Sequence, residues 1–231
     1  MQKTNIQCLG FIMDGNRRWA KERGLETVEG HRKGSEVFAE VVEFIRDKSI
    51  PHAIFYSFSS ENWQRDDEEV TYLLNLFAEK ISELSEKLNK EEALDKKVRI
   101  RFVGDIGRFP DFLQKQIFQL EKETSEFTNS TIWIALSYGG RDEIVHAVNR
   151  AIEMGESVDE KTFERLLWTA GMPDPDLIIR TGGQQRLSNF LPWQSTYSEL
   201  KFVDAYWPEV TSEMLDELLK EFAERQRNFG K

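Results

Sequence analysis

The 231-residue sequence has only one cysteine, Cys8, and only three histidines, His31, His52 and His146. A single cysteine excludes an intramolecular disulfide, and we interpret Cys8 as a small apolar residue of a buried strand. The histidines do not have the spacing of a zinc site. No apolar run approaches the ~20 residues that span a bilayer, and the N-terminus lacks a secretory signal pattern. We therefore expect a cytoplasmic protein.

The sequence also lacks an excess of positive charge and the common nucleotide-binding motifs. Its formal net charge is -10, whereas a non-specific nucleic-acid binder normally carries a broad basic face, so we expect no nucleic-acid partner. The sequence contains no GxxxxGK[ST] motif, no GxGxxG after the first strand and no GxSxG elbow. Hydrophobic residues make up 39% and aromatic residues 12%, which is the composition of a globular protein.

Short apolar runs alternate with segments of helical periodicity along the chain. The predicted strands are residues 9–13, 53–58, 98–103, 131–137, 177–179 and 200–203. Between them, apolar residues recur at steps of three or four, and these predict helices over residues 37–45, 70–88, 144–152 and 214–222. This alternation is typical of an α/β protein with a central, mainly parallel sheet and helices on both faces. No proline- or glycine-rich linker interrupts it, so we predict a single domain over residues 1–231.

Polar residues follow the predicted strands at their carboxyl ends. The segments are DGN (14–16), SSENW (59–63), GD (104–105), YGGR (138–141) and RTGG (180–183). In open parallel sheets, ligands bind beyond this edge. Glycine lets a ligand approach the backbone, and helix N-termini offer free N–H groups, so these segments predict an anion site.

Asp14 permits two interpretations. It is a good helix N-cap residue, and residues 19–21 have helical character. However, Arg17, Arg18 and His31 add positive charge close in sequence to this one carboxylate. A carboxylate with arginines at a glycine turn suits a phosphate bridged by Mg²⁺, because the carboxylate holds the cation and the arginines bind the remaining oxygens.

A second arginine-rich segment, RTGGQQRLSNF, covers residues 180–190. One interpretation of this segment is a surface loop with solvated arginines. Against it, Arg180 is the last residue of an apolar strand, where burying an unpaired cation is costly. Two arginine clusters indicate two anionic groups, or one diphosphate held from both sides. The acidic run at residues 66–69 precedes a long helix, and we interpret it as a helix start rather than a metal site, because acidic side chains there favour the helix dipole.

Six motifs in order resemble those of the cis-prenyltransferases. They are MDGNRRWA (13–20) with Gly30-His31, FSSENWQR (58–65), GDIGRFP (104–110), SYGGRDEI (137–144), DLIIRTGGQQRLSNFLPWQ (176–194) and YSELKF (197–202). The resemblance covers residues 9 to 230 and implies a Mg²⁺-dependent enzyme, normally a homodimer. Such an enzyme condenses an allylic diphosphate, expected to be farnesyl diphosphate, with successive isopentenyl diphosphates. The expected product is undecaprenyl diphosphate, a lipid-carrier precursor for cell-wall synthesis, and its release leaves open a peripheral membrane contact.

The resemblance also assigns roles to the matching residues. Asp14 and Asn62 take the catalytic positions, and Asp14 with Glu199 would hold Mg²⁺. The substrate-binding positions are Gly15, Asn16, Arg17, Arg18, Trp19 and His31 for the allylic diphosphate, Ser59, Ser60, Glu61, Trp63 and Arg65 between the substrates, and Arg180, Arg186, Leu187 and Ser188 for isopentenyl diphosphate. Because an amide is a poor base at pH 7, we expect Asn62 to position a phosphate oxygen or a water, with the diphosphate or Asp14 receiving the proton.

A growing polyprenyl chain needs an apolar enclosure, because exposing it to water costs ~0.8 kcal/mol per CH₂. We predict a hydrophobic product tunnel between two helical stripes, although each residue would also suit an ordinary core. The predicted wall is Val37, Phe38, Val41 and Val42 with Leu73, Leu74, Phe77, Ile81 and Leu84.

Four residues depart from the family pattern. Thr27 replaces an arginine, Arg17 a glycine, Gln184 a glutamate and Asn228 an arginine. Thr27 removes one expected phosphate contact, for which Arg17 would compensate. Asn228 weakens an expected contact from a partner subunit. The number of condensations and the preferred primer are not fixed by these features.

Two competing interpretations have less support. A non-catalytic subunit of a heteromeric cis-prenyltransferase would be degraded in its DGN and arginine-rich segments, whereas Asp14, Asn62, Arg180, Arg186 and Glu199 are all present. An aspartate-dependent phosphatase would need DxD after the first strand, but residue 16 is asparagine.

Overall fold

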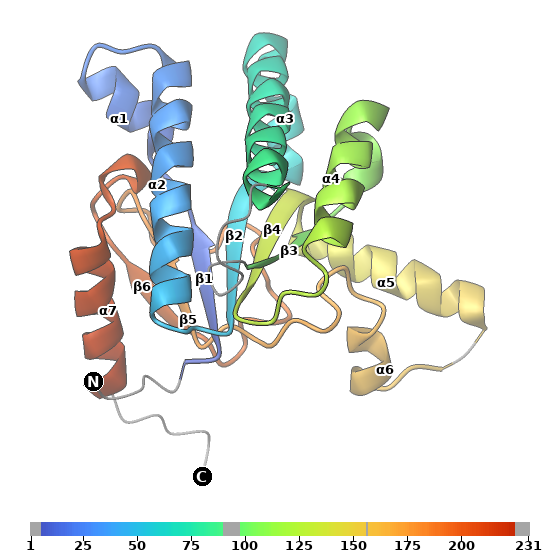
Figure 1. Ribbon diagram of the computed structural model, residues 1–231. Coiled ribbons are helices and arrows are strands. Elements are labelled where there is room, and N and C mark those ends of the chain that lie inside the picture. The colour runs from blue at the N-terminus through green and yellow to red at the C-terminus, as the bar shows by residue number, and fades with distance from the viewer. Residues whose placement is uncertain (1–5, 90–97, 156, 225–231) are drawn as a thin grey trace.

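A computed structural model describes residues 6–89, 98–155 and 157–224. Six parallel strands form one sheet in the order β3-β4-β2-β1-β5-β6 (Figure 1). The strands are β1 (Cys8–Ile12), β2 (His52–Ser59), β3 (Arg99–Val103), β4 (Thr131–Tyr138), β5 (Leu177–Arg180) and β6 (Glu199–Phe202). All six predicted strands are confirmed. The sheet largely buries the first five, whereas β6 is an edge strand in which Leu200 is 40% exposed.

Helices and short 3-10 turns connect the strands. The helices are α1 (Asn16–Glu22), α2 (Thr27–Asp47), α3 (Asp67–Asn89), α4 (Asp111–Glu123), α5 (Gly140–Met154), α6 (Glu160–Glu164) and α7 (Ser212–Glu224), and the turns are η1 (Ser60–Gln64), η3 (Ile106–Arg108) and η4 (Trp207–Glu209). The main core joins one sheet face to α2, α3, α4 and α7. The fully buried Cys8 belongs to a second core on the opposite face, as predicted for an apolar strand residue.

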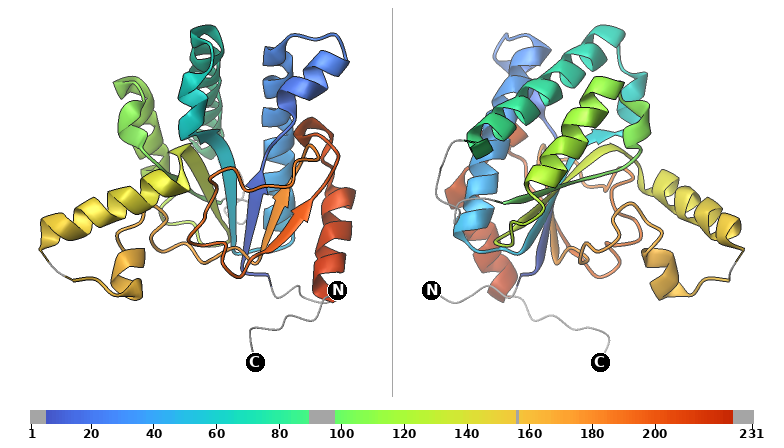
Figure 2. Two further views of the ribbon diagram at one scale, coloured as in Figure 1. Left: turned by 180° about the vertical axis from the view of Figure 1, so that it is seen from behind. Right: turned by 45° about the vertical axis from the view of Figure 1, so that its right-hand side comes forward.

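Helix α5 has a different buried face from the one that its apolar residues indicate. It extends away from the sheet with α6 beside it (Figure 2), so only a narrow side of the helix is covered. Ala147 and Ala151 are buried on that side, whereas Val145 and Ile152 are 59% and 71% exposed. Within the described residues, no helix has both the length and the apolar character needed to cross a membrane.

Candidate functional site

The Asp14 carboxylate lies between two arginines at the carboxyl edge of the sheet. Arg18 Nη2 is 3.1 Å from Asp14 Oδ1, and Arg180 Nη2 is 2.9 Å from Oδ2. Arg180 ends β5 and pairs in register with Ile12 of β1, which brings it beside Asp14. The helix-cap interpretation of Asp14 is wrong, because the N-cap of α1 is Gly15, whose φ of 112° suits a residue without a side chain.

Arg180 orders the loop that follows β5. Its side chain is 5% exposed, and Nη1 donates hydrogen bonds to Ser188 Oγ at 2.8 Å and to the Arg186 carbonyl. The Arg186 guanidinium is turned outward, where Nη1 donates to Gln184 Oε1 at 2.7 Å. The two predicted arginines therefore occupy different environments, with Arg180 inside the site and Arg186 on its exposed rim.

The other two predicted residues of this loop are Leu187 and Ser188, and both contact residues of the second core. Leu187 packs against the second core. The Tyr56 hydroxyl donates to the Ser188 carbonyl at 3.3 Å, and burial raises the pKa of Tyr56, so this donor keeps its proton at neutral pH. Ser188 has a φ of 50°, a left-handed conformation that the surrounding contacts must maintain.

The loop after β2 folds into η1 and orients the Asn62 amide. The Ser59 backbone N–H donates to Asn62 Oδ1 at 3.1 Å, which completes a capping box. The amide oxygen is thereby used by the backbone, and the Asn62 side chain lines the cavity described below. Trp63 Nε1 donates to Ser137 Oγ at 2.9 Å, and this contact anchors the turn to the end of β4.

The two polar residues that precede Asn62 point toward the loop after β5. Asn189 Nδ2 donates to Glu61 Oε1 at 3.0 Å, and Ser60 Oγ lies 3.4 Å from the other Glu61 oxygen. This contact connects the predicted loop between the substrates with the predicted isopentenyl diphosphate loop.

A second cationic cluster surrounds Glu69 in the first turn of α3. His31 Nε2 and Arg65 Nη1 each donate to Glu69 Oε1 at 3.1 Å, and Arg17 Nη1 is 3.7 Å from Oε2. The interpretation of the acidic run as a helix start is confirmed. It nevertheless missed Glu69 as a site residue, for which the four-residue spacing from Arg65 was a signal.

Helix α1 sits close enough to α2 to place Asn16 beside the cavity. A Cβ at Gly34 would lie 2.4 Å from Asn16 Oδ1, so only glycine permits this approach. Asn16 is among the residues that line the cavity, and its buried Oδ1 has no hydrogen-bond partner among the residues described. Trp19 instead packs beneath the Arg23 guanidinium, 4.7 Å from the ring centre, and is not part of the cavity wall.

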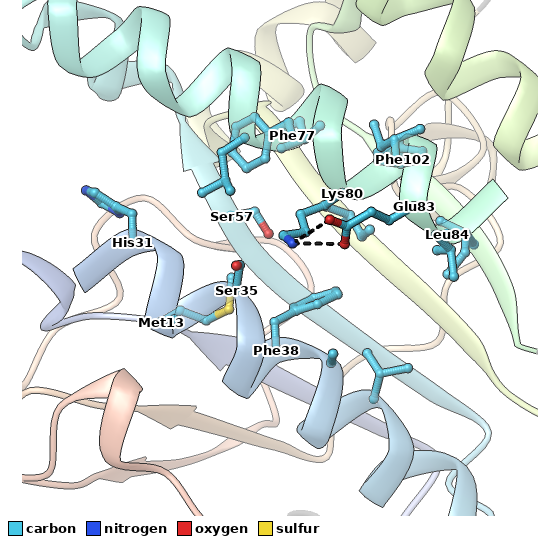
Figure 3. A pocket seen from close by; sticks show the side chains of 18 of the residues that line it. Met13, His31, Ser35, Phe38, Ser57, Phe77, Lys80, Glu83, Leu84 and Phe102 are labelled. Carbon is cyan, nitrogen blue, oxygen red and sulfur yellow. Dashed lines mark hydrogen bonds and ion pairs between the residues drawn. The ribbon is translucent and has the colours of Figure 1, made fainter. Parts of the chain in front are cut away.

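A cavity of about 420 Å³ extends between α2 and α3 from these polar groups (Figure 3). Its apolar wall includes Phe38, Val42, Leu73, Phe77, Ile81 and Leu84 of the predicted stripes, with Phe102, Ile134 and Leu136 from the strands. Met13 and His31 lie at one end, and Leu84 lies toward the other. The Lys80 ammonium is paired with Glu83 at 2.9 Å within the same helix, which neutralises both charges.

Three residues of the predicted tunnel wall do not line the cavity. Val37 and Val41 are 2% and 3% exposed and belong to the main core, because they lie on a different side of α2 from Phe38 and Val42. Leu74 packs against the same core. The prediction was wrong for these residues because the stripe wraps around each helix more widely than the cavity does.

Glu199, the second predicted metal ligand, lies toward the opposite end of the sheet from Asp14. It is the first residue of β6 and pairs with Leu177, the first residue of β5, whereas Arg180 ends that strand. Three residues of strand correspond to ~10 Å. Within one chain, the structure therefore does not bring Glu199 to Asp14.

The donor set around Asp14 decides how a metal ion would fit. In the described parts of the chain, no three His, Cys, Asp or Glu side chains gather where they could hold a metal. A lone carboxylate suits Mg²⁺ that takes its other ligands from phosphate oxygens and water. Asp14 thus fits Mg²⁺ in combination with a diphosphate and not as part of a protein-only cage.

Two further residues fix Asp14 and were not predicted from the sequence. Thr181 Oγ1 donates to the Asp14 carbonyl at 2.7 Å, and the Trp207 backbone N–H donates to the same oxygen at 3.0 Å. Thr181 adjoins Arg180 in a motif that the sequence did single out, but nothing in the sequence signals the contact from η4.

Comparison with known proteins places this arrangement in a family. The family described as "Putative undecaprenyl diphosphate synthase" matches residues 12–230. An isoprenyl transferase of Thermotoga maritima is 41% identical over 97% of this chain and 96% of its own. A ditrans,polycis-undecaprenyl-diphosphate synthase of Micrococcus luteus, described as specific for (2E,6E)-farnesyl diphosphate, is 36% identical over 96% of this chain and 90% of its own.

A solved structure agrees with the sequence relatives. The lavandulyl diphosphate synthase of Lavandula x intermedia, solved in complex with dimethylallyl diphosphate, has a TM-score of 0.92 and 30% identity, with 99% of each chain covered. The family match spans nearly the whole chain, and the relatives align along almost their full length. The chain belongs to the undecaprenyl diphosphate synthase family of isoprenyl transferases.

Proposed function

We propose that this protein is a Mg²⁺-dependent cis-prenyltransferase that extends farnesyl diphosphate with isopentenyl diphosphate to a long-chain polyprenyl diphosphate, of undecaprenyl length. The observation that carries the proposal is that a cationic region adjoins an apolar cavity. Cationic groups around Asp14 and Glu69 adjoin one end of a cavity whose walls are otherwise mostly apolar. An allylic diphosphate has the same division between a charged head and an apolar chain.

The two cationic clusters would hold two diphosphates on either side of the reacting carbons. His31 and Arg65 line the cavity, and Arg17 approaches them at Glu69. These three groups suit the allylic diphosphate, whose chain must enter the cavity. Arg180 and Ser188, with Arg186 on the rim, suit isopentenyl diphosphate. Guanidinium groups fixed by hydrogen bonds stabilise charge that develops on a departing diphosphate, because they need little reorganisation during the reaction.

Asn62 would orient a substrate and not remove its proton. Its Oδ1 already accepts the Ser59 N–H, so its Nδ2 hydrogens are the groups left for a phosphate oxygen. An amide nitrogen has no basic lone pair at neutral pH. The proton released from isopentenyl diphosphate would therefore pass to a diphosphate oxygen or to Asp14.

Asp14 would hold Mg²⁺ together with diphosphate oxygens. When bound, the ion neutralises negative charge on the diphosphate. Both Asp14 oxygens contact guanidinium groups in the free chain, so those contacts must rearrange when a substrate binds. Glu199 as a second ligand remains a prediction, and its position means that it would have to act from outside the Asp14 cluster of its own chain.

The cavity would accept the growing chain and set its length. The wall residues Leu73 and Leu88 of α3 are fifteen positions apart, which corresponds to ~22 Å of helix. Each added CH₂ that enters the cavity is removed from water at a gain of ~0.8 kcal/mol. The apolar walls thus favour elongation until the cavity is filled.

We further propose a homodimer that works in the cytoplasm and contacts a membrane peripherally when the product leaves. The exposed apolar residues Val145, Val148 and Ile152 of α5 support a self-association surface. The chemistry of the product supports the membrane contact, since a free polyprenyl chain is insoluble in water.

One assay tests this function. Purified protein is incubated with Mg²⁺, labelled isopentenyl diphosphate and one of three primers: farnesyl, geranylgeranyl or dimethylallyl diphosphate. We expect labelled long-chain product with farnesyl diphosphate, loss of incorporation with EDTA, and a large loss in Asp14→Asn. No incorporation with any primer would refute the enzyme and favour a non-catalytic subunit, whereas a short product would refute only the undecaprenyl length.

A further inference from the structure

Beside the cavity, the Glu69 carboxylate contacts three nitrogen-bearing side chains. Its side chain is only 10% exposed, and it receives hydrogen bonds from His31 and Arg65 at 3.1 Å. Arg17 lies 3.7 Å away and is 57% exposed. The three partners come from α2, from the loop before α3 and from α1, so Glu69 joins three separate segments.

The charges of this cluster do not cancel. Arg17 and Arg65 are cationic, whereas burial lowers the pKa of His31, so His31 is neutral at pH 7 and donates from Nε2. One carboxylate therefore faces two guanidinium groups, and a net positive charge remains for an incoming anion. A diphosphate that binds these groups must compete with Glu69 for them.

The ordinary explanation for an acidic residue at this position does not account for Glu69. Acidic side chains in the first turn stabilise a helix through its dipole, but Asp67 and Glu68 already occupy that turn and are exposed to solvent. Glu69 alone is turned inward onto the cations. Keeping a carboxylate in a site for anions weakens anion binding, which points to a role in the state before the substrate arrives.

We propose that Glu69 is a built-in counter-ion of the allylic diphosphate subsite, which holds Arg17, His31 and Arg65 in place in the free protein and competes with the diphosphate for them. This proposal rests on the proposed function. Glu69 is a positioning residue, because it acts through the three side chains. Its negative charge keeps the guanidinium groups from moving apart through mutual repulsion, and it lowers the affinity of the subsite for a diphosphate.

Glu69→Gln separates the charge from the hydrogen bonds. The amide keeps an acceptor oxygen for Arg65 or His31 but no longer competes electrostatically with a diphosphate. We expect the Kd for farnesyl diphosphate, measured by calorimetry with EDTA and without isopentenyl diphosphate, to fall about tenfold, equivalent to ~1.4 kcal/mol. Inorganic pyrophosphate serves as a second probe and should show the same direction, because the effect lies at the head group.

Glu68→Gln is the matched control, because it removes the same charge from the same helical turn without touching the cluster. We expect its Kd to equal that of the wild type. Glu69→Asp keeps the charge and should stay within about twofold of the wild-type Kd. The rise in melting temperature on adding pyrophosphate should be larger in Glu69→Gln than in Glu68→Gln, which gives a second readout on the same proteins.

An unchanged or higher Kd in Glu69→Gln would overturn the counter-ion role, since a merely structural carboxylate weakens binding when it is replaced. A fall of the same size in Glu68→Gln would also overturn it, because the effect would then be long-range charge. Failure of the proposed function is distinguishable: wild-type protein would neither bind farnesyl diphosphate nor incorporate isopentenyl diphosphate.

Discussion

Replacing Arg180 with lysine tests whether its planar guanidinium, and not only its charge, organises the site. Arg180 Nη2 contacts Asp14, while Nη1 contacts both Ser188 and the Arg186 carbonyl. A lysine ammonium is a single point that can keep the contact with Asp14 but cannot also reach the loop from the same position. The substitution therefore removes the contacts to the loop while the ion pair remains.

The expected magnitude follows from burial. The Arg180 side chain is 5% exposed, so water does not replace the lost partners. Hydrogen bonds that involve a charged group contribute about 1.5–3 kcal/mol each, and the lysine recovers part of that by local rearrangement. We expect the free energy of unfolding to fall by about 2 kcal/mol, which lowers the melting temperature of a chain of this size by about 4–8 °C. The KM for isopentenyl diphosphate should rise at least about tenfold.

Arg186→Lys on the same loop is the control for this experiment. The Arg186 guanidinium is exposed and contacts only Gln184 among the described interactions of its side chain, so its replacement should cost less than about 0.5 kcal/mol. Melting temperatures by calorimetry and initial rates against isopentenyl diphosphate concentration provide the two measurements. Equal, small effects of Arg180→Lys and Arg186→Lys would refute the view that the guanidinium of Arg180 orders the loop.

Leu84→Trp should shorten the polyprenyl product because the tryptophan side chain fills the cavity, whereas Leu74→Trp on the same helix should leave product length unchanged. Chromatography of labelled product measures both lengths. Equal product lengths in the two variants would show that the growing polyprenyl chain does not enter this cavity. Gly34→Ala should lower the free energy of unfolding by about 1–3 kcal/mol, because a Cβ there meets Asn16. Gly107→Ala, which meets only one atom at 3.5 Å, is its control in urea titrations. Burial lowers the pKa of His31, so the unfolded chain binds the extra proton and stability falls as the pH drops below about 6.5. His31→Gln should flatten this slope between pH 5 and 7, and an unchanged slope would contradict the assignment.

The sequence predicts the strands and the polar ends well because both depend on local pattern. A buried parallel strand needs an apolar run, and the residue after it reaches the ligand-binding edge whatever the rest of the chain does. Asp14 and Arg180 could be placed on this basis, and the register of β1 with β5 joins them. Glu199 is assigned from the resemblance and not from this reasoning, and as the first residue of β6 it lies at the other edge of the sheet.

The sequence cannot determine which side of an amphipathic helix faces a cavity and which faces the core. The apolar stripe of α2 is wide enough to include both Val37 and Phe38, which therefore look equivalent in the sequence. Val37 nevertheless packs into the core, whereas Phe38 lines the cavity. The direction of a charged side chain is equally hidden. Arg186 stands in a site motif, but its carbonyl and not its guanidinium contacts Arg180.

The unusual pair Arg17 and Thr27 becomes intelligible once Glu69 is considered. Thr27 begins α2 and carries no charge, so it cannot supply the cation that the sequence resemblance leads us to expect at this position. Arg17 projects from α1 instead and comes within 3.7 Å of Glu69, in the cluster that contains His31. Because Arg17 is 57% exposed, solvent screens its ion pairs and its guanidinium is held only weakly. This chain therefore needs a carboxylate such as Glu69 to retain it, and Glu69→Gln should weaken the hold on Arg17 more than the hold on the better buried Arg65.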